Sequence, residues 1–544
     1  MSGKEQVVGK VDDLAPGQMK TVQIGKTKVL LVRTLSGGFW ALGATCPHAG
    51  AKLENGLLCQ ERIVCPWHKS VFDVGTGEVL ESPALDDLPK YSVETRGSDL
   101  VLSFPQKVKS ARTKRPAGPR RSKTVKTFVI LGAGAAGLAA ALQLRKSGFG
   151  GRVVLISQES RLSYDRTLLS KQYLSGKAEP VWLPLRPESF FAQSGIERWQ
   201  RLVESVDVNG RKITFHNGYP MLAYDALLLA TGGTPIQLKT DGAREHARTL
   251  RTPEDADAII NLAKAGSEAV VIGSSFIGME VASSLTQREV QTTVITPEAV
   301  PFEKKLGRPV GEILQRLHER KGVQFRLKNK VSRITSRGTG KRELMLESGE
   351  SLQADLVVVG IGVRPATDYL TGIKLNPDGG VLVDECFRVP GQSALFAAGD
   401  IAAFPVPPNG GIARIEHWRV AEEQGRIAAL NMMERRTPYA GVPYFWTTHF
   451  DVRFDYVGHA EHWDEIIVRG DPDKPDFIAF YINGGRPAAA IAARQEMQAA
   501  MFMELLRQNR VPDPEELRSE VLDLTGFLFG RGAQTGNLAN RGFF

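Results

Sequence analysis

The pattern of apolar and polar positions changes twice along the 544-residue chain. Residues 1–105 carry short β-branched runs at 21–24 and 29–32, separated by glycine turns and without a long helical period, which predicts a small all-β domain. From residue 127 onward, strand-like apolar runs alternate with helical stretches rich in Ala and Leu. Beyond residue 441 the strand-like runs return and predict a final α+β domain.

The middle of the chain holds two copies of one pattern: an apolar strand, a glycine-rich turn and a helix. The first strands are expected at 126–131 and 269–272, and each copy continues into a second apolar run, at 153–156 and 292–295. A β-α-β pattern of this kind is typical of parallel sheets that bind nucleotides at the carboxyl ends of their strands. We therefore expect two dinucleotide-binding domains.

Composition and charge narrow the possible classes. Hydrophobic residues make up 42% and charged residues 24%, which excludes a disordered or fibrous chain, and four cysteines exclude a disulfide-stapled secreted scaffold. The net charge of +9 belongs to the segment 106–126, which carries nine Lys and Arg and no acid. We interpret this segment as an extended linker; the alternative is a basic arm that binds nucleic acid.

The chain shows no strong targeting segment. Its first residues contain no apolar stretch typical of a secretory signal. The longest uncharged run, 127–144, is a marginal transmembrane candidate by length, but three glycines at motif spacing give it a better explanation. We expect a soluble, cytoplasmic protein with no membrane partner and no specific nucleic-acid partner.

Two cysteine–histidine pairs lie in the β-rich region. Cys46 and His48 form a C-x-H pair, and Cys65 and His68 form a C-x-x-H pair after sixteen intervening residues. A Rieske [2Fe–2S] centre takes two thiolates on one iron and two imidazoles on the other, so two mixed loops suit it. Structural zinc is the alternative, although zinc sites usually keep their cysteines together and their histidines together.

The first glycine motif comprises Gly132, Gly134 and Gly137, between a predicted strand and a predicted helix. Its glycines permit a tight turn, a close approach of the backbone to a pyrophosphate, and packing of helix on strand. Glu159 follows Gly137 by 22 residues, at the end of the next strand, where an acid can bind the adenosine ribose. These features together predict a dinucleotide site.

The second motif has Gly273 and Gly278 but carries Ser275 in place of the middle glycine. The following strand ends near Thr296, with Glu298 just beyond, and no arginine stands there to meet a 2′-phosphate. The motif supports a nicotinamide nucleotide. It favours NADH without deciding between NADH and NADPH.

The segments Cys46-Pro-His48-Ala-Gly and Cys65-Pro-Trp-His68-Lys69-Ser-Val-Phe-Asp resemble the two cluster loops of the Rieske family, over about residues 5–105. Lys69 departs from the pattern, which usually has Gly there, and this puts the local turn in doubt. The cysteine pair that cross-links the loops in cytochrome-complex Rieske proteins is missing. The resemblance is therefore to the ferredoxin and oxygenase type.

Residues 127 to about 510 resemble the pyridine-nucleotide flavoprotein reductases, and Glu416-His417-Trp418 and Pro443-Tyr-Phe-Trp446 add the ferredoxin-reductase and apoptosis-inducing-factor branch. With a Rieske domain in front, the chain resembles the Rieske-bearing branch of that family. The resemblance implies a glutathione-reductase-like α/β fold that binds FAD and NAD(P)H. The expected division is a Rieske domain at 1–105, a linker at 106–126, an FAD domain at 127–248 and 381–440, an NAD(P) domain at 249–380, and a C-terminal α+β interface domain at 441–544.

The same resemblance implies roles for individual side chains. Lys171, Glu280 and Trp418 are the expected catalytic residues. Arg166 and Lys171 would lie against the isoalloxazine, Glu280 and Trp418 near the nicotinamide, and Asp400 on the flavin ribityl chain or pyrophosphate. The expected cofactor-binding residues are Gly132, Gly134, Gly137, Glu159, Arg166, Lys171, Ala230, Thr231, Gly232, Gly273, Gly278, Glu280, Gly362, Gly399, Asp400, Trp418 and Trp446.

For Asp400, Lys171 and His417, an interpretation without a functional role stays open. Asp400 could be only a helix N-cap, Lys171 a solvated helix charge, and His417 a polar residue near the flavin without a part in proton transfer. The stretch from Gly132 to Cys386 contains no other cysteine, which excludes the C-x₄-C pair of the disulfide reductases and their chemistry.

The sequence therefore predicts an NAD(P)H-dependent FAD oxidoreductase of ferredoxin-reductase type. Electrons would pass from NAD(P)H through FAD to the Rieske cluster and on to a protein acceptor, which could be a ferredoxin, a cytochrome or an oxygenase component. The linker is long enough for the Rieske domain to dock at the flavin of its own chain. The alternatives are the reverse electron path and a redox-sensing interaction protein, and a homodimer stays open.

Overall fold

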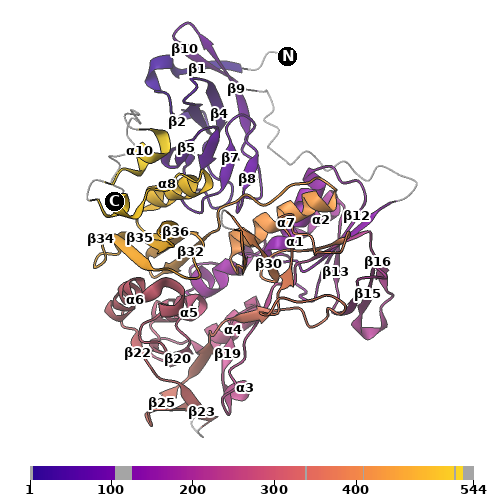
Figure 1. Ribbon diagram of the computed structural model, residues 1–544, viewed down its shortest axis with the longest axis vertical. Coiled ribbons are helices and arrows are strands. Elements are labelled where there is room, and N and C mark those ends of the chain that lie inside the picture. Colours follow the sequence, from indigo (N-terminus) through magenta and orange to yellow (C-terminus); the bar gives the residue numbers. More distant parts are fainter. Residues whose placement is uncertain (1–3, 105–124, 337–339, 408–409, 520–521, 531–544) are drawn as a thin grey trace.

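The computed structural model describes residues 4–104, 125–336, 340–407, 410–519 and 522–530. In Figure 1 the N-terminal strands form one end of the molecule and the second nucleotide-binding domain forms the other. The first nucleotide-binding domain and the C-terminal domain lie between them. The linker predicted at 106–126 falls almost wholly outside the described residues.

The N-terminal domain consists of two antiparallel sheets, as the short β-branched runs predict. The larger sheet has the order β1-β10-β9-β4-β3-β2, and the smaller one has the order β5-β6-β7-β8. The loops β4–β5 and β6–β7 carry the two Cys/His pairs to one end of the small sheet. The strands are β1 (Lys4–Lys10), β2 (Gln18–Ile24), β3 (Thr27–Arg33), β4 (Phe39–Gly43), β5 (Leu57–Cys59), β6 (Arg62–Val64), β7 (Val71–Asp73), β8 (Val79–Glu81), β9 (Lys90–Arg96) and β10 (Asp99–Phe104).

The first nucleotide-binding domain is built on a parallel sheet of order β13-β12-β11-β17-β29. Helices α1 and α7 pack against each other closely, because a Cβ at Gly425 would lie 2.0 Å from the Ala136 carbonyl. Strand β29 comes from the later part of the chain, so the domain is discontinuous. Its main elements are β11 (Thr127–Leu131), α1 (Ala135–Lys146), β12 (Arg152–Ser157), β13 (Ile196–Gln200), β17 (Ala226–Leu229), β29 (Leu395–Ala397) and α7 (Trp418–Met432).

The second nucleotide-binding domain repeats this architecture with the order β19-β26-β20-β21-β22. The three central strands of this parallel sheet, β26, β20 and β21, are largely buried, which explains their continuous apolar runs in the sequence. Its main elements are β19 (Arg248–Thr249), α4 (Pro253–Leu262), β20 (Glu268–Ile272), α5 (Phe276–Thr286), β21 (Gln291–Ile295), α6 (Glu303–Arg320), β22 (Gln324–Arg326) and β26 (Leu356–Val359).

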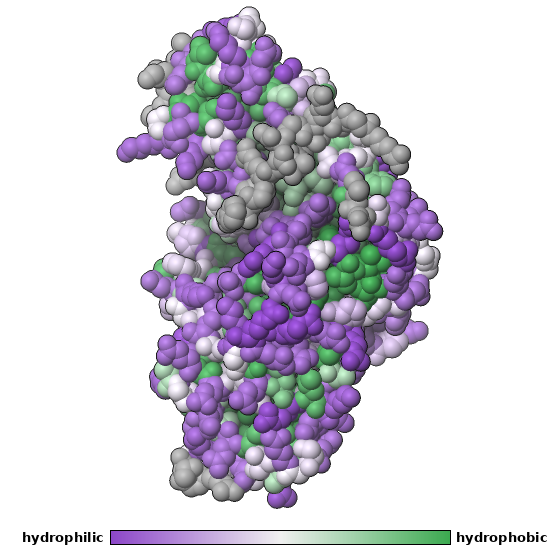
Figure 2. Space-filling model, turned by 90° about the vertical axis from the view of Figure 1, so that its left-hand side faces the viewer, coloured by the Kyte–Doolittle hydropathy of each residue, from purple (hydrophilic) through white to green (hydrophobic). Residues whose placement is uncertain are grey.

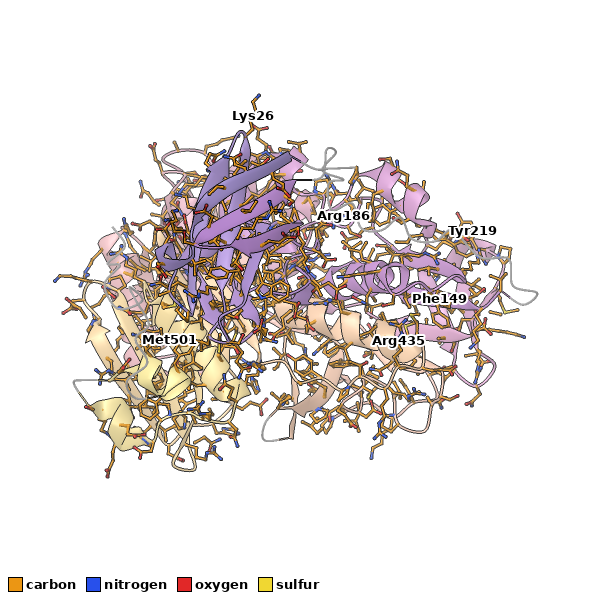
Figure 3. All side chains as sticks on the ribbon, turned by 90° about the horizontal axis from the view of Figure 1, so that it is seen from above. Lys26, Phe149, Arg186, Tyr219, Arg435 and Met501 are labelled. Atoms are coloured by element: carbon orange, nitrogen blue, oxygen red, sulfur yellow. The ribbon has the colours of Figure 1, made fainter. Side chains whose placement is uncertain are left out.

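The C-terminal domain is an antiparallel sheet of order β32-β33-β36-β35-β34 with α8 on one face, and it confirms the predicted α+β class. The same apolar cluster continues from α8 into the N-terminal domain through Leu57, Cys59, Val64 and Val71. In Figure 3 Met501 of α8 lies beside the N-terminal strands. The elements are β32 (Tyr444–His449), β33 (Val452–Gly458), β34 (Glu465–Asp471), β35 (Asp476–Asn483), β36 (Arg486–Ala493), α8 (Glu496–Arg507), α9 (Pro514–Arg518) and α10 (Leu524–Phe529).

Smaller helices and strands extend or connect these units. Figure 2 shows one face of the molecule, on which hydrophilic residues predominate. Among the described residues, no helix combines the length and the apolar character needed to cross a membrane. The connecting elements are α2 (Glu188–Ser194), β14 (Val203–Asp207), β15 (Lys212–Phe215), β16 (Leu222–Ala223), β18 (Gly233–Pro235), α3 (Ala243–His246), β23 (Val331–Ser336), β24 (Arg342–Leu346), β25 (Ser351–Ala354), β27 (Val363–Pro365), β28 (Val381–Leu382), β30 (Ala402–Val406) and β31 (Gly411–Arg414).

Candidate redox site

The four predicted cluster ligands meet at the tips of two loops. The Nδ1 atoms of His48 and His68 face each other at 3.0 Å, and the two rings lie edge to face. Cys46 and Cys65 are buried behind them. Each loop is closed by a backbone hydrogen bond: the Cys46 N–H donates to the Ala51 carbonyl at 2.9 Å, and the Cys65 N–H makes the same type of bond. The fold therefore brings two thiols and two imidazoles together.

The protonation of these side chains suits a Rieske centre. The Cys46 thiol hydrogen-bonds to Cys65, which lowers the pKa of Cys65 to about 7 and raises that of Cys46. Burial lowers the pKa of His48 and of His68, so both rings are neutral and able to bind metal. In the described ranges no three His, Cys, Asp or Glu side chains converge on one point, and a Rieske centre takes two protein ligands per iron.

The turn at Lys69 is present even though the family pattern usually has Gly at this position. Its φ of +56° is the left-handed region where Gly is the usual residue. The side chain is fully buried, and its Nζ donates to the Pro66 carbonyl at 2.8 Å and to Asp455 of β33 at 2.9 Å. The strained turn is thus occupied by a residue that joins the N-terminal domain to the C-terminal domain.

A second buried contact joins the N-terminal domain to helix α7. The guanidinium of Arg419 donates to the Ser82 carbonyl at 2.7 Å and pairs with Glu81 at 2.6 Å. The Ser82 N–H in turn donates to Glu423 at 3.1 Å. At the rim, Arg186 pairs with Asp86 at 2.8 Å, and Figure 3 shows Arg186 beside the N-terminal strands. The N-terminal domain is docked on both neighbouring domains.

Trp446 lies between the cluster ligands and the interior of the reductase. Its indole ring is 4.4 Å from the His68 ring and 6.1 Å from the His48 ring, centroid to centroid. The same side chain lines a cavity of about 1220 Å³ between the two nucleotide-binding domains. One aromatic residue therefore separates the histidines from this cavity.

The cavity gathers most of the predicted cofactor-binding residues. Gly137, Gly273 and Gly278 are not among its lining residues; a Cβ at Gly137 would lie 1.8 Å from the Gly132 carbonyl, so this glycine packs helix on strand as predicted. The predicted residues that line the cavity are Gly132, Gly134, Glu159, Arg166, Lys171, Ala230, Thr231, Gly232, Glu280, Gly362, Gly399, Asp400, Trp418 and Trp446.

The glycine turn before α1 leaves room for a phosphate group. Gly134 is the N-cap of α1, and a Cβ placed on it would meet no atom within 4 Å. Gly132 has a φ of +105° and turns the chain sharply out of β11. The free N–H groups and the helix dipole at this point favour an anion. The open space in front of Gly134 fits the pyrophosphate of a dinucleotide.

Glu159 and Arg166 lie together in the cavity. Glu159 accepts hydrogen bonds from the Tyr164 hydroxyl at 2.8 Å and from Arg166 at 2.9 Å. The Arg166 guanidinium also stacks on the Tyr164 ring. Arg166 is thus placed beside the predicted ribose-binding acid, whereas its predicted contact with the isoalloxazine stays a prediction.

Lys171 and Glu280 form a buried pair elsewhere in the cavity wall. Lys171 Nζ lies 3.3 Å from Glu280 Oε2, and the Ser170 hydroxyl donates to the same carboxylate. Both charged side chains are less than a tenth exposed, so the alternative that Lys171 is a solvated helix charge is wrong. Asp400 is followed by strand β30 rather than by a helix, so the N-cap alternative for Asp400 is wrong as well.

His417 also lines the cavity, and its environment keeps it neutral. The ring stacks on Phe445 with centroids 3.8 Å apart. Burial lowers the pKa of His417 to about 3, and Lys305 and His459 add to this effect. Within the cavity the neutral ring is placed as a packing and hydrogen-bonding group.

The end of the second nucleotide motif presents an acid to the cavity. Thr296 is buried and accepts a hydrogen bond from the Ser274 hydroxyl at 2.8 Å, so it is turned away. Glu298 lines the cavity, and burial raises its pKa. Lys304 stands 4.0 Å from Glu298. Glu298, and not Thr296, faces the cavity at the end of this strand.

Several residues of the site are absent from the sequence prediction. Four of them make contacts across 167 to 386 positions of sequence, and no pattern in the sequence indicates these contacts. These residues are Arg419, Tyr444, Thr447, His449 and Asp455.

Comparison with known proteins agrees with this geometry. Residues 126–425 match the pyridine nucleotide-disulphide oxidoreductase family, residues 4–92 the Rieske [2Fe-2S] domain, and residues 444–528 the reductase C-terminal domain. Human apoptosis-inducing factor 3 is 38% identical over 97% of this chain and 89% of its own length. The ferredoxin–NAD⁺ reductase component of the anthranilate 1,2-dioxygenase system of Burkholderia cepacia is 32% identical over 74% of this chain and 99% of its own length.

A solved structure extends the comparison to the fold. The covalent putidaredoxin reductase–putidaredoxin complex superposes with a TM-score of 0.71, at 30% identity, over 74% of this chain and 98% of the matched chain. The predicted resemblance, fold class and cofactors (FAD, a [2Fe–2S] cluster and NAD(P)H) are thereby confirmed. The chain belongs to the pyridine nucleotide-disulphide oxidoreductase family, in a form that carries a Rieske domain at its N-terminal end.

Proposed function

We propose that this protein is an NAD(P)H-dependent FAD oxidoreductase of ferredoxin-reductase type, which passes electrons through its own Rieske cluster to an acceptor protein. The observation that carries the proposal is the position of Trp446, which touches the ring of His68 and lines the cavity that fits the dinucleotides. FAD supplies the chemistry that links the two ends, since it takes up a hydride and releases electrons one at a time.

Different residues of the chain would hold different parts of the two cofactors. The turn at Gly134 and the acid Glu159 would hold the pyrophosphate and ribose of FAD, and Glu298 would hold the ribose of the nicotinamide nucleotide, which favours NADH. Lys171 and Glu280 form a fixed charge pair in the cavity wall. The docked N-terminal domain holds the rings of His48 and His68 against Trp446.

The relatives support a protein acceptor. One matched structure is a complex of a reductase with putidaredoxin, a separate protein. In this chain the Rieske domain is already docked, so we place it where electrons leave the reductase, and a ferredoxin, a cytochrome or an oxygenase component would take them from the cluster. The domain division predicted from sequence, the cytoplasmic location and the homodimer stay predictions.

The test separates the two redox modules. His68→Ala should remove the cluster and leave the reduction of a dye by NADH largely intact, whereas Gly134→Val should prevent FAD binding and abolish all activity. Iron content and the flavin absorption spectrum check each variant independently of turnover. If the cluster variant loses dye reduction as completely as the flavin variant, the proposed path is wrong. A reduced partner protein that reduces the cluster of NADH-free enzyme, with electrons passing on to FAD, would instead favour the reverse path.

A further inference from the structure

A chain of hydrogen bonds leads from Glu280 into the interior of the protein. The Thr447 hydroxyl donates to Glu280 Oε1 at 2.7 Å. The hydroxyl oxygen of Thr447 also lies 3.1 Å from His449 Nε2. His449 Nδ1 lies 3.2 Å from Nε2 of His318. Thr447, His449 and His318 are each at most 1% exposed. These hydrogen bonds join α5, β32 and α6, which belong to two different domains.

The protons of this chain all point toward Glu280. The single hydroxyl proton of Thr447 is used in the hydrogen bond to the Glu280 carboxylate. In the hydrogen bond between Thr447 and His449, the donor is therefore the Nε2–H of His449. Burial lowers the pKa of His449 to about 4, so the ring is neutral at pH 7 and its Nδ1 carries no proton. His449 Nδ1 therefore accepts a hydrogen bond from the Nε2–H of His318.

The surroundings of His449 favour this one arrangement. The charged groups that act on its ring are Glu280, which raises the pKa of His449, and Lys171, which lowers it. The Met279 carbonyl of α5 also acts on the ring as a hydrogen-bond acceptor. The rings of Phe302 and Phe454 pack edge-on against the imidazole. The ring is thus fixed between a polar edge and apolar walls.

The series of hydrogen bonds that starts at Glu280 ends at His318. Burial lowers the pKa of His318 well below its ordinary value, and the Phe325 and Phe450 rings pack edge-on against it. Among the described residues, its Nδ1 has no hydrogen-bond partner. A neutral imidazole with one satisfied N–H and an unpartnered Nδ1 acts as a donor only. Within the described part of the protein, the only side chain to which the His318 ring donates is therefore His449.

We propose that Thr447, His449 and His318 are positioning residues that hold the Glu280 carboxylate in one orientation against Lys171 at the hydride-transfer site. The role of that pair rests on the proposed function; the hydrogen-bond chain does not. Ser170 donates to Glu280 Oε2 and Thr447 donates to Oε1, whereas Lys171 Nζ lies between the two oxygens, at 3.3 Å from Oε2 and 3.4 Å from Oε1. Without the donor chain, Oε1 keeps only its longer contact with Lys171, and the carboxylate turns toward other donors.

The first arm of the test reads the proton positions directly. In full-length holoprotein labelled with ¹⁵N-histidine, the rings of His449 and His318 should both be neutral Nε2–H tautomers at about pH 6, in addition to the neutral ring of His417. His449→Gln should remove one of them and leave the other, since a Gln amide also accepts from His318. A protonated ring, or an Nδ1–H tautomer, at either position overturns the proposal. This arm needs no NADH and decides the hydrogen-bond chain even if the proposed function is wrong.

The second arm tests the effect on the site. His449→Leu should shift the midpoint potential of bound FAD and slow its reduction by NADH roughly tenfold, with the KM for NADH unchanged. His449→Gln should restore both values, because its amide carries a donor and an acceptor. His216→Gln, at an exposed position, is the matched control. Wild-type potential and rate in the Leu variant, or equal impairment of the Leu and Gln variants, would refute the positioning role.

Discussion

Lys69 and Asp455 form a buried ion pair across 386 positions of sequence, with 2.9 Å between Nζ and Oδ2. The lysine belongs to the cluster-binding loop, and the aspartate belongs to the C-terminal sheet. Tyr444 and Arg453 also bind this carboxylate, at 2.8 and 3.0 Å. The pair therefore links the position of the cluster to the position of the strand that carries Trp446.

Replacing Lys69 with Met should weaken this docking strongly. Loss of one member of a buried ion pair typically costs about 3–5 kcal/mol of the free energy of unfolding, and the remaining pairing of Asp455 with Arg453 should keep the cost toward the lower end. The reduction of the cluster by NADH should slow, while dye reduction stays near the wild-type rate. Lys69→Met/Asp455→Asn should not recover the stability, since the second change removes the carboxylate that pairs with Arg453. Lys52→Met, at an exposed position of the same domain, is the control; equal effects at both lysines would contradict the prediction.

Changing Trp446 to Leu should separate flavin chemistry from cluster chemistry. The variant loses the ring contact with His68, which is worth about 0.5–1.5 kcal/mol of stability beyond its buried area. Stopped-flow absorbance should show slower appearance of the reduced cluster after mixing with NADH. Trp446→Phe keeps an aromatic ring and should be affected less. If both variants reduce the cluster at the wild-type rate, Trp446 is not on the electron path.

Glu298 should set the preference for NADH. A carboxylate can accept hydrogen bonds from ribose hydroxyls and repels a 2′-phosphate, so Glu298→Ala should raise the KM for NADH roughly tenfold and bring NADPH closer to it. The measurement is kcat/KM for both nucleotides. Glu312→Gln, on the exposed side of α6, should leave the ratio unchanged. A wild-type enzyme that prefers NADPH would count against this role of Glu298.

The stability of the protein should fall as the pH rises, because of Glu422. Burial raises the pKa of Glu422 well above 4.5, its Oε2 has no partner among the described residues, and Asp165 lies nearby. The folded state therefore holds a proton that the unfolded state releases. The contribution of this group is complete below about pH 4.5 and is lost toward the raised folded pKa, at up to ~1.4 kcal/mol per pH unit.

Glu422→Gln should remove that slope from thermal melting temperatures measured between acidic and alkaline pH. The amide has nearly the same shape and does not ionise. Glu434→Gln, at an exposed site beyond the same helix, provides the comparison. An unchanged slope in the Glu422 variant would show that the carboxyl ionises without cost.

The sequence predicts the parts of this molecule that are built from neighbours along the chain. The ligands Cys46, His48, Cys65 and His68 lie in two short loops, and the glycines of each nucleotide motif lie within one turn, so spacing alone specifies their geometry. Strand positions follow from apolar runs for the same reason: β11 and β20 begin within one residue of their predicted starts.

Contacts between distant segments are beyond such reasoning. Nothing local to Thr447 or His318 indicates that they face each other through His449, because the meeting depends on how β32 and α6 pack. Lys69 shows the limit well. Its departure from the family pattern was visible, but the sequence points to a doubtful turn, whereas the structure shows a positive φ accepted in exchange for an ion pair with Asp455.

The docking of the N-terminal domain also changes how this enzyme should respond to dilution. Where the reductase and its ferredoxin are separate proteins, their encounter slows as both are diluted and as salt screens their charges. Here both partners belong to one polypeptide and meet through buried charges such as Arg419 and Glu81. The effective concentration of one for the other is fixed by the fold. Each molecule therefore carries both redox centres, the flavin and the cluster. Electron transfer between them should be first order at any protein concentration.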